Sequence, residues 1–106
     1  MKKYTKDHVW FDNGRLGVTR HAVQELGEIV YVAAEKEASE GAPFGQIESV
    51  KAVSDLTAPF DMKNIKVNPA LETDPSLLNR DPDTWIAEAD FEEKGGMTEK
   101  EYLESL

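Results

Sequence analysis

The chain of 106 residues contains no cysteine. Without cysteine it can form neither a disulfide framework nor a thiolate metal site, and it has no thiol nucleophile. Any sulfur redox chemistry must therefore come from an attached group. Long apolar runs are also missing: the longest, residues 29–34, is far shorter than the roughly 20 residues of a membrane span. The amino terminus has no apolar segment of signal-peptide length, which predicts a cytoplasmic protein.

Basic residues are scarce, with 12 Lys and Arg against 21 Asp and Glu and a net charge of -9. A surface of this sign repels phosphate backbones and anionic lipids, so neither nucleic acid nor a membrane is an expected partner. It favours docking on basic protein surfaces, although solubility alone explains the charge equally well. The hydrophobic fraction of 40% is enough for one folded domain over residues 1–106.

Most of the chain is predicted to form short strands separated by turns. The Asn13-Gly14 pair predicts a tight hairpin between strands at residues 9–11 and 16–18. Thr19 is placed to cap a short helix that ends at Gly27. Further strands are expected at residues 28–33, 44–48, 52–56, 63–67 and 84–89.

Two segments depart from this pattern. Residues 68–83 contain three Asn-Pro or Asp-Pro dipeptides, which predict a long loop with one helical turn near Leu77 and Leu78. At the end of the chain, Thr98 and Glu101 form a capping-box pattern. It predicts a C-terminal helix over about residues 98–106, with its apolar face, Tyr102, Leu103 and Leu106, turned toward the body.

The fold class expected from these elements is mainly β. Many brief strands with regular turns are typical of a small β-sandwich or flattened barrel, here with a short internal helix and a C-terminal helix.

The segment IESVKAVSDL, residues 47–56, places Lys51 in an apolar setting. Its apolar residues recur at every third position, and neither a helix nor a continuous strand buries all of them on one face. The remaining interpretation is a hairpin over about residues 43–57 with Lys51 at its tip and ordinary negative φ angles in the turn. Spacing alone leaves open whether this lysine is a solvated charge or a group presented to a partner.

The core ESVKA, preceded by GVTRHAVQELGEIVYV and followed by VSDLTAP, resembles the H protein of the glycine cleavage system, a relative of lipoyl domains. The resemblance extends from YTKDHVW to the terminal EYLESL. It implies a lipoyl-domain-like barrel-sandwich hybrid with lipoate joined to Lys51 by an amide bond. The implied carrier is monomeric, with no catalytic residue and no metal. Its arm shuttles an aminomethyl group between glycine decarboxylase and aminomethyltransferase and is reoxidised by dihydrolipoyl dehydrogenase.

An exposed lysine amine is almost entirely protonated at neutral pH, so the domain is not expected to acylate itself. The resemblance therefore implies a modifying enzyme, either a lipoate ligase or an octanoyl/lipoyl transferase. Its expected contacts flank the lysine: Glu48, Ser49, Val50 and Ala52. For Glu48, a simple solvated position at the strand end is an equally good interpretation.

The chain departs from the family at Val9, where the family usually has a glutamate that could pair with the ammonium of the aminomethyl cargo. Asp55 or Glu25 is a candidate replacement for this arm contact. The usual Ser-Gly turn is Asp61-Met62 here, which predicts a rebuilt turn that uses Asn64.

These departures keep two other hypotheses open. The first is an H-like lipoyl carrier uncoupled from glycine cleavage, which serves lipoate relay or a lipoate-linked stress or redox response. The second is an unmodified β-sandwich interaction module. Two other polar residues, His8 and His21, are expected to be solvated near turns rather than to form an acid-base or metal cluster.

Overall fold

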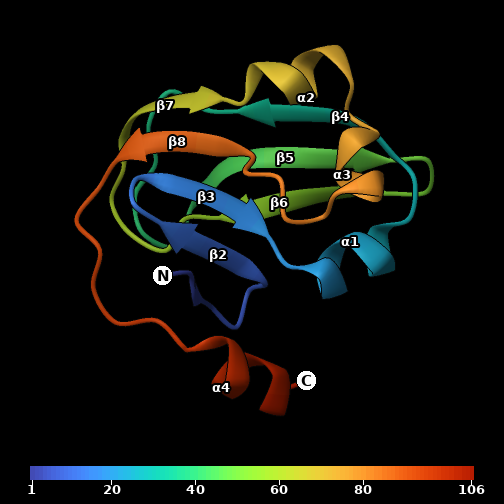
Figure 1. Ribbon diagram of the computed structural model, residues 1–106. Helices are drawn as coiled ribbons and strands as arrows, with labels where there is room; N and C mark the ends of the chain where they lie inside the picture. The colour runs from blue at the N-terminus through green and yellow to red at the C-terminus, as the bar shows by residue number, and fades with distance from the viewer.

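The computed structural model describes residues 1–106 as two antiparallel sheets with four short helices (Figure 1). The five-stranded sheet has the order β1-β2-β3-β8-β7 and the three-stranded sheet the order β4-β5-β6. The strands are β1 Lys3–Tyr4, β2 Val9–Asp12, β3 Arg15–Val18, β4 Ile29–Ala34, β5 Pro43–Ser49, β6 Val53–Thr57, β7 Lys63–Val67 and β8 Ala87–Asp90. The helices are α1 Arg20–Leu26, α2 Pro69–Thr73, α3 Leu77–Arg80 and α4 Glu99–Glu104. The predicted mainly β fold class is confirmed.

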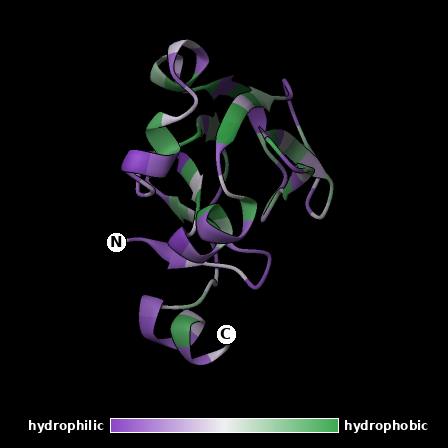
Figure 2. Cartoon of the chain, turned by 90° about the vertical axis from the view of Figure 1, so that its right-hand side faces the viewer, coloured by the Kyte–Doolittle hydropathy of each residue, from purple (hydrophilic) through white to green (hydrophobic).

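One continuous core fills the space between the two sheets. Phe11 and Leu16 contribute from the five-stranded sheet, and Phe44 and Ile47 from the three-stranded sheet, all fully buried. Because side chains alternate along a strand, the neighbours of Ile47 in β5 point outward. Figure 2 shows the result along the chain: the strands mix hydrophobic and hydrophilic residues, whereas the amino-terminal segment is mainly hydrophilic.

Several local predictions are confirmed by the backbone. Asn13 and Gly14 have φ angles of 47° and 81° and connect β2 to β3, as a two-residue hairpin turn requires. The hydroxyl of Thr19 accepts the amide hydrogen of Ala22 at the start of α1. Asn64 adopts the positive φ angle, 54°, that the altered turn was expected to need.

The prediction for residues 68–83 was wrong in part, because a second helix, α2, starts directly after Asn68. The Asn68 side chain accepts the amide hydrogen of Ala70, and Pro69 occupies the first helical position. Proline is favoured there, because its fixed φ suits the helix and its missing N–H has no partner within the helix. The dipeptide therefore marks a helix start and not only a turn.

The last strand was also predicted imprecisely, since β8 begins at Ala87 and not at residue 84. The residues just before Ala87 instead belong to the segment that follows α3. In its turn the backbone amide of Thr84 donates to the carbonyl oxygen of Asp81.

Helix α4 forms at the predicted capping box. The Thr98 hydroxyl accepts the Glu101 amide hydrogen, and the Glu101 carboxylate accepts that of Thr98; these bonds hold the pKa of Glu101 below its usual value. Tyr102 is buried and stacks on Tyr4. The prediction that the two leucines of this helix face the body was wrong: Leu103 and Leu106 are 58% and 55% exposed, and Tyr102 is the only buried residue of the helix. No helix of the chain is both long and apolar enough to cross a bilayer.

Candidate functional site

Lys51 lies at the tip of the β5–β6 hairpin, where the spacing predicted it. The last paired residues of the two strands are Glu48 and Val53, and the turn between them has no positive φ angle. The Ser49 amide donates to the carbonyl oxygen of Ala52 at 2.7 Å, and the Ser49 hydroxyl accepts the Ala52 amide hydrogen at 3.1 Å. These bonds close the turn beneath the exposed lysine. The lysine is therefore carried on a short, fixed support.

The tip is also tied to the segment between α1 and β4. The amide of Val50 donates to the carbonyl oxygen of Glu28 at 3.0 Å. That segment is held by Asn79 of α3, whose side-chain oxygen accepts the Ile29 amide hydrogen at 2.9 Å and whose side-chain nitrogen donates to the Gly27 carbonyl at 2.7 Å. In Figure 1 the β5–β6 turn extends past α3, on the same side of the molecule as α1. Sequence reasoning did not identify Asn79 as part of this support.

Replacing Asn79 by alanine is expected to lower the free energy of unfolding by roughly 1–3 kcal/mol, because the buried Ile29 loses the acceptor for its amide. The amide of Val50 should exchange with solvent faster, because the segment that accepts its hydrogen bond loosens. Urea denaturation and hydrogen exchange measure these two effects.

Asn79→Asp is the comparison variant for this prediction, since it keeps the acceptor for Ile29 and replaces the donor to Gly27 by a carboxylate oxygen. It should lie between the wild type and Asn79→Ala. Unchanged exchange at Val50 in the alanine variant would contradict the proposed support of the tip.

A cleft of about 290 Å³ lies between α1 and β6. We call it the α1–β6 cleft; its polar lining is Asp7, His8, His21, Glu25, Ser54 and Asp55, and apolar residues of α1, β3 and β6 complete it. The lysine lies near one end of α1, because a methyl group at Gly27 would be 3.6 Å from Cε of Lys51. Gly27 directly follows Leu26, which lines the cleft. The cleft is therefore close to the end of the Lys51 side chain.

Both predicted arm contacts line this cleft, Glu25 from α1 and Asp55 from β6. The Asp55 carboxylate also accepts a hydrogen bond from the side-chain nitrogen of Gln46 in β5, at 3.1 Å. Asp7 adds a third carboxylate. Val9 is buried in the core and pairs with Val18. The negative charge of the cleft thus comes from its walls, with none from position 9.

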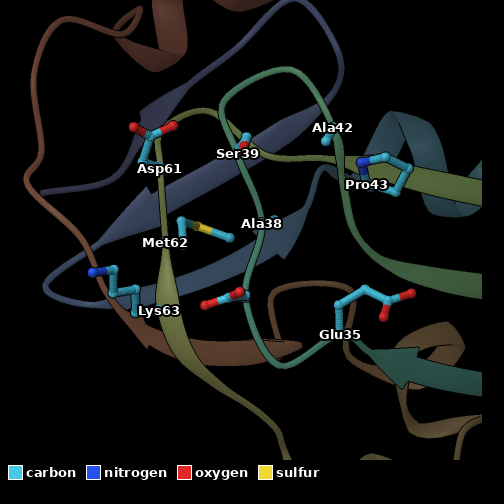
Figure 3. A pocket seen from close by; sticks show the side chains of 9 residues that line it. Glu35, Ala38, Ser39, Ala42, Pro43, Asp61, Met62 and Lys63 are labelled. Atoms are coloured by element: carbon cyan, nitrogen blue, oxygen red, sulfur yellow. The ribbon is translucent and has the colours of Figure 1, made fainter.

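A larger hollow of about 660 Å³ lies at the base of the hairpin (Figure 3). Figure 3 shows Met62 beside Ala38, with Glu35, Asp61 and Lys63 around them. Pro43, at the start of β5, lines this hollow, so β5 separates it from the tip by about 20 Å. Lys51 and the α1–β6 cleft are therefore not part of it.

Three of the four predicted enzyme contacts, Glu48, Val50 and Ala52, are exposed around the lysine. Ser49 lies differently: it is 5% exposed, and its hydroxyl is bonded within the turn.

The exposed surface continues from the tip onto the outer face of the small sheet. Glu48 has Tyr31 and Val53 as its partners on the neighbouring strands. Val50, Tyr31 and Val53 are 68%, 56% and 58% exposed. Exposed apolar side chains that gather in this way are typical of a protein contact surface.

Comparison with known proteins decides which family has this site. The family model described as Glycine cleavage H-protein matches residues 2–106. This chain belongs to the glycine cleavage H-protein family. It is 38% identical over 104 residues to the glycine cleavage system H protein of Thermotoga maritima, covering 90% of this chain and 84% of that protein. It is 45% identical over 95 residues to the glycine cleavage system H protein of Myxococcus xanthus, covering 81% of this chain and 74% of that protein.

A solved structure of an H protein shows the same architecture. The glycine cleavage system H protein of Mycobacterium marinum superposes with a TM-score of 0.83 at 33% identity, covering 98% of this chain and 94% of that one. The resemblance inferred from ESVKA and its flanks is thereby confirmed.

Proteins of the H family are non-catalytic carriers that hold lipoate covalently on a lysine. The residues of this chain fit such a group. Lys51 is an exposed primary amine on a fixed turn, and the cleft beside it combines apolar walls with polar groups. The absence of cysteine is consistent with sulfur chemistry supplied entirely by the attached group.

Proposed function

We propose that Lys51 is the lipoylated residue and that the chain acts in glycine cleavage. When attached, lipoate supplies a disulfide that takes up an aminomethyl group at glycine decarboxylase and yields it at aminomethyltransferase, with dihydrolipoyl dehydrogenase restoring the oxidised form. The observation that supports this proposal most directly is the exposed amine of Lys51 on a turn closed by Ser49 and Ala52. We further propose that the protein works as a monomer in the cytoplasm.

The modifying enzyme, a lipoate ligase or an octanoyl/lipoyl transferase, must deprotonate the lysine amine itself, because no base of this chain is bonded to it. Glu48, Val50 and Ala52 are exposed and available for direct contact. Ser49 acts differently in this proposal. Because it is buried and bonded to Ala52, it contributes by fixing the shape of the turn that the enzyme binds.

The α1–β6 cleft is the proposed resting place of the arm. Its apolar walls suit an aliphatic chain, and Glu25 and Asp55 favour a cationic cargo over a neutral or anionic one. Both carboxylates are on exposed residues, so they attract the cargo without holding it in a dry site. They supply the charge that Val9 cannot.

Reconstitution with glycine decarboxylase tests the role. The lipoylated protein should support exchange of labelled bicarbonate into glycine, and the unlipoylated protein should not. A fully lipoylated protein that gives no exchange would contradict the glycine cleavage role. That result would favour the carrier uncoupled from glycine cleavage, for which the replacement of the usual glutamate by Val9 is the supporting observation.

A further inference from the structure

His8 is held in an unusual conformation beside the α1–β6 cleft, not left in solvent as its sequence context suggested. Its φ angle is 66°, which costs energy for a residue other than glycine. Its amide donates to the carbonyl of Thr5, and its carbonyl accepts the Thr19 amide hydrogen at 3.0 Å. Its Nδ1 lies 2.5 Å from the hydroxyl oxygen of Tyr102 in α4. The ring is thus fixed from both its backbone and its side chain.

We propose that Tyr102 and Thr19 fix the proton of the neutral His8 ring on Nε2, so that the cleft contains an N–H donor at this position and no imidazole base. The assignment follows from the direction of a short chain of hydrogen bonds that runs from the start of α1 through α4 to His8.

The direction of this chain is set at its buried end. Thr19 and Tyr102 are 4% and 2% exposed, and their hydroxyl oxygens are 2.7 Å apart. The Thr19 oxygen accepts the Ala22 amide hydrogen, and the only acceptor within reach of its own proton is the Tyr102 oxygen. If Tyr102 donated to Thr19 instead, the Thr19 proton would have no partner, which buried hydroxyls avoid. Thr19 therefore donates to Tyr102.

The tautomer of His8 follows from this direction. Tyr102 has one proton, and with its oxygen accepting from Thr19 it donates that proton to Nδ1 of His8. An imidazole nitrogen that accepts a hydrogen bond is unprotonated, so the neutral ring carries its proton on the other nitrogen.

The second ring nitrogen of His8 is free and accessible, on a residue that lines the cleft. Nε2 has no hydrogen-bond partner in the protein, whereas every fully buried side-chain nitrogen and oxygen has one, so Nε2 is accessible from outside. His8 lines the α1–β6 cleft. The ring of His21 lies at a centroid distance of 5.1 Å from that of His8, and the acidic residues that line the same cleft are Asp7, Glu25 and Asp55.

The consequence for the carrier rests on the proposed function of the cleft. An imidazole with a free lone pair takes a proton from a nearby ammonium, and a cationic amine is the cargo that the carboxylates favour. With its proton on Nε2, neutral His8 can only donate toward the cleft. Tyr102 is therefore a positioning residue: it acts through His8, and α4 contributes to the cleft without touching it.

Long-range proton–nitrogen NMR correlations of the ¹⁵N-labelled, unmodified protein, recorded at about pH 8, identify the tautomer of the neutral ring directly. We expect the Nε2–H form for His8. Tyr102→Phe keeps the aromatic stacking and removes the hydroxyl, so His8 should become a mixture of tautomers, with the signals of His21 as an internal reference. Thr19→Ser keeps the hydroxyl and should retain the wild-type form. An Nδ1–H tautomer, or an equal mixture, in the wild type would overturn the proposal.

A second readout concerns the lipoylated protein after loading with the aminomethyl group. Tyr102→Phe should shorten the lifetime of the loaded form by roughly tenfold, because a base then reaches the cargo, while Thr19→Ser should not. A changed tautomer with an unchanged lifetime would overturn the sheltering role of His8. The NMR result is obtained without lipoate, so its failure is distinguishable from failure of the proposed attachment at Lys51.

Discussion

Replacing Lys51 by arginine is expected to abolish lipoylation completely while leaving the fold intact. Arginine keeps the positive charge, but a guanidinium does not replace the amine as the nucleophile in amide formation. Lys51 is exposed at the tip of a turn and makes no ion pair, so the free energy of unfolding should change by less than about 0.5 kcal/mol. Incubation with a lipoate ligase, lipoate and ATP, followed by mass measurement of the whole protein, gives the result.

The matched control is Lys63→Arg, which changes an exposed lysine at the base of the hairpin, in the hollow of Figure 3. This variant should be modified to the same extent as the wild type. A Lys51→Arg protein that still gains a lipoyl group would show that another amine accepts it.

Replacing Gly45 by alanine should give the largest loss of stability among single conservative changes in the hairpin. A methyl group at this position would lie 2.4 Å from the carbonyl oxygen of Ala33 and 3.3 Å from Cα of Ala34. These are backbone atoms of the neighbouring strand, so β4 and β5 would have to separate. We expect a cost of roughly 3 kcal/mol, a large part of the 5–15 kcal/mol that stabilises a typical domain. The midpoint of urea unfolding measures it.

Gly41→Ala is the control, since nothing lies within 4 Å of the added methyl group and only its φ angle of 87° opposes the change. It should cost about 1 kcal/mol. An equal loss in the two variants would contradict the close packing of β4 on β5.

The features that could be predicted from the sequence are those encoded by neighbouring residues. Asn13-Gly14 is sufficient for the β2–β3 turn, and Thr98 with Glu101 for the start of α4. The position of Lys51 at a hairpin tip also followed from local spacing, because no regular element buries every third residue on one face. The function of that lysine required the family resemblance, since a lysine in a turn has no chemistry of its own.

The features that were missed depend on contacts between distant parts of the chain. Asn79 supports the tip through residues 50 and 52 positions away, and Tyr102 bonds to His8 across 94 positions. No local pattern marks these partners, and each residue has an adequate local explanation: Asn79 in a predicted loop, and Tyr102 on the apolar face of a predicted helix. The start of α2 is different: Asn68-Pro69 contained the signal, but the same dipeptide also suits a turn.

The proposed carrier function depends on one covalent bond at one lysine, and peptide mapping by tandem mass spectrometry of the protein from its native host tests this bond most directly. We predict one added lipoyl group, found on the peptide that contains IESVKAVSDL and assigned by its fragments to Lys51. A lipoyl group on any other lysine, or a native protein that carries none under conditions of active lipoate synthesis, would contradict the account.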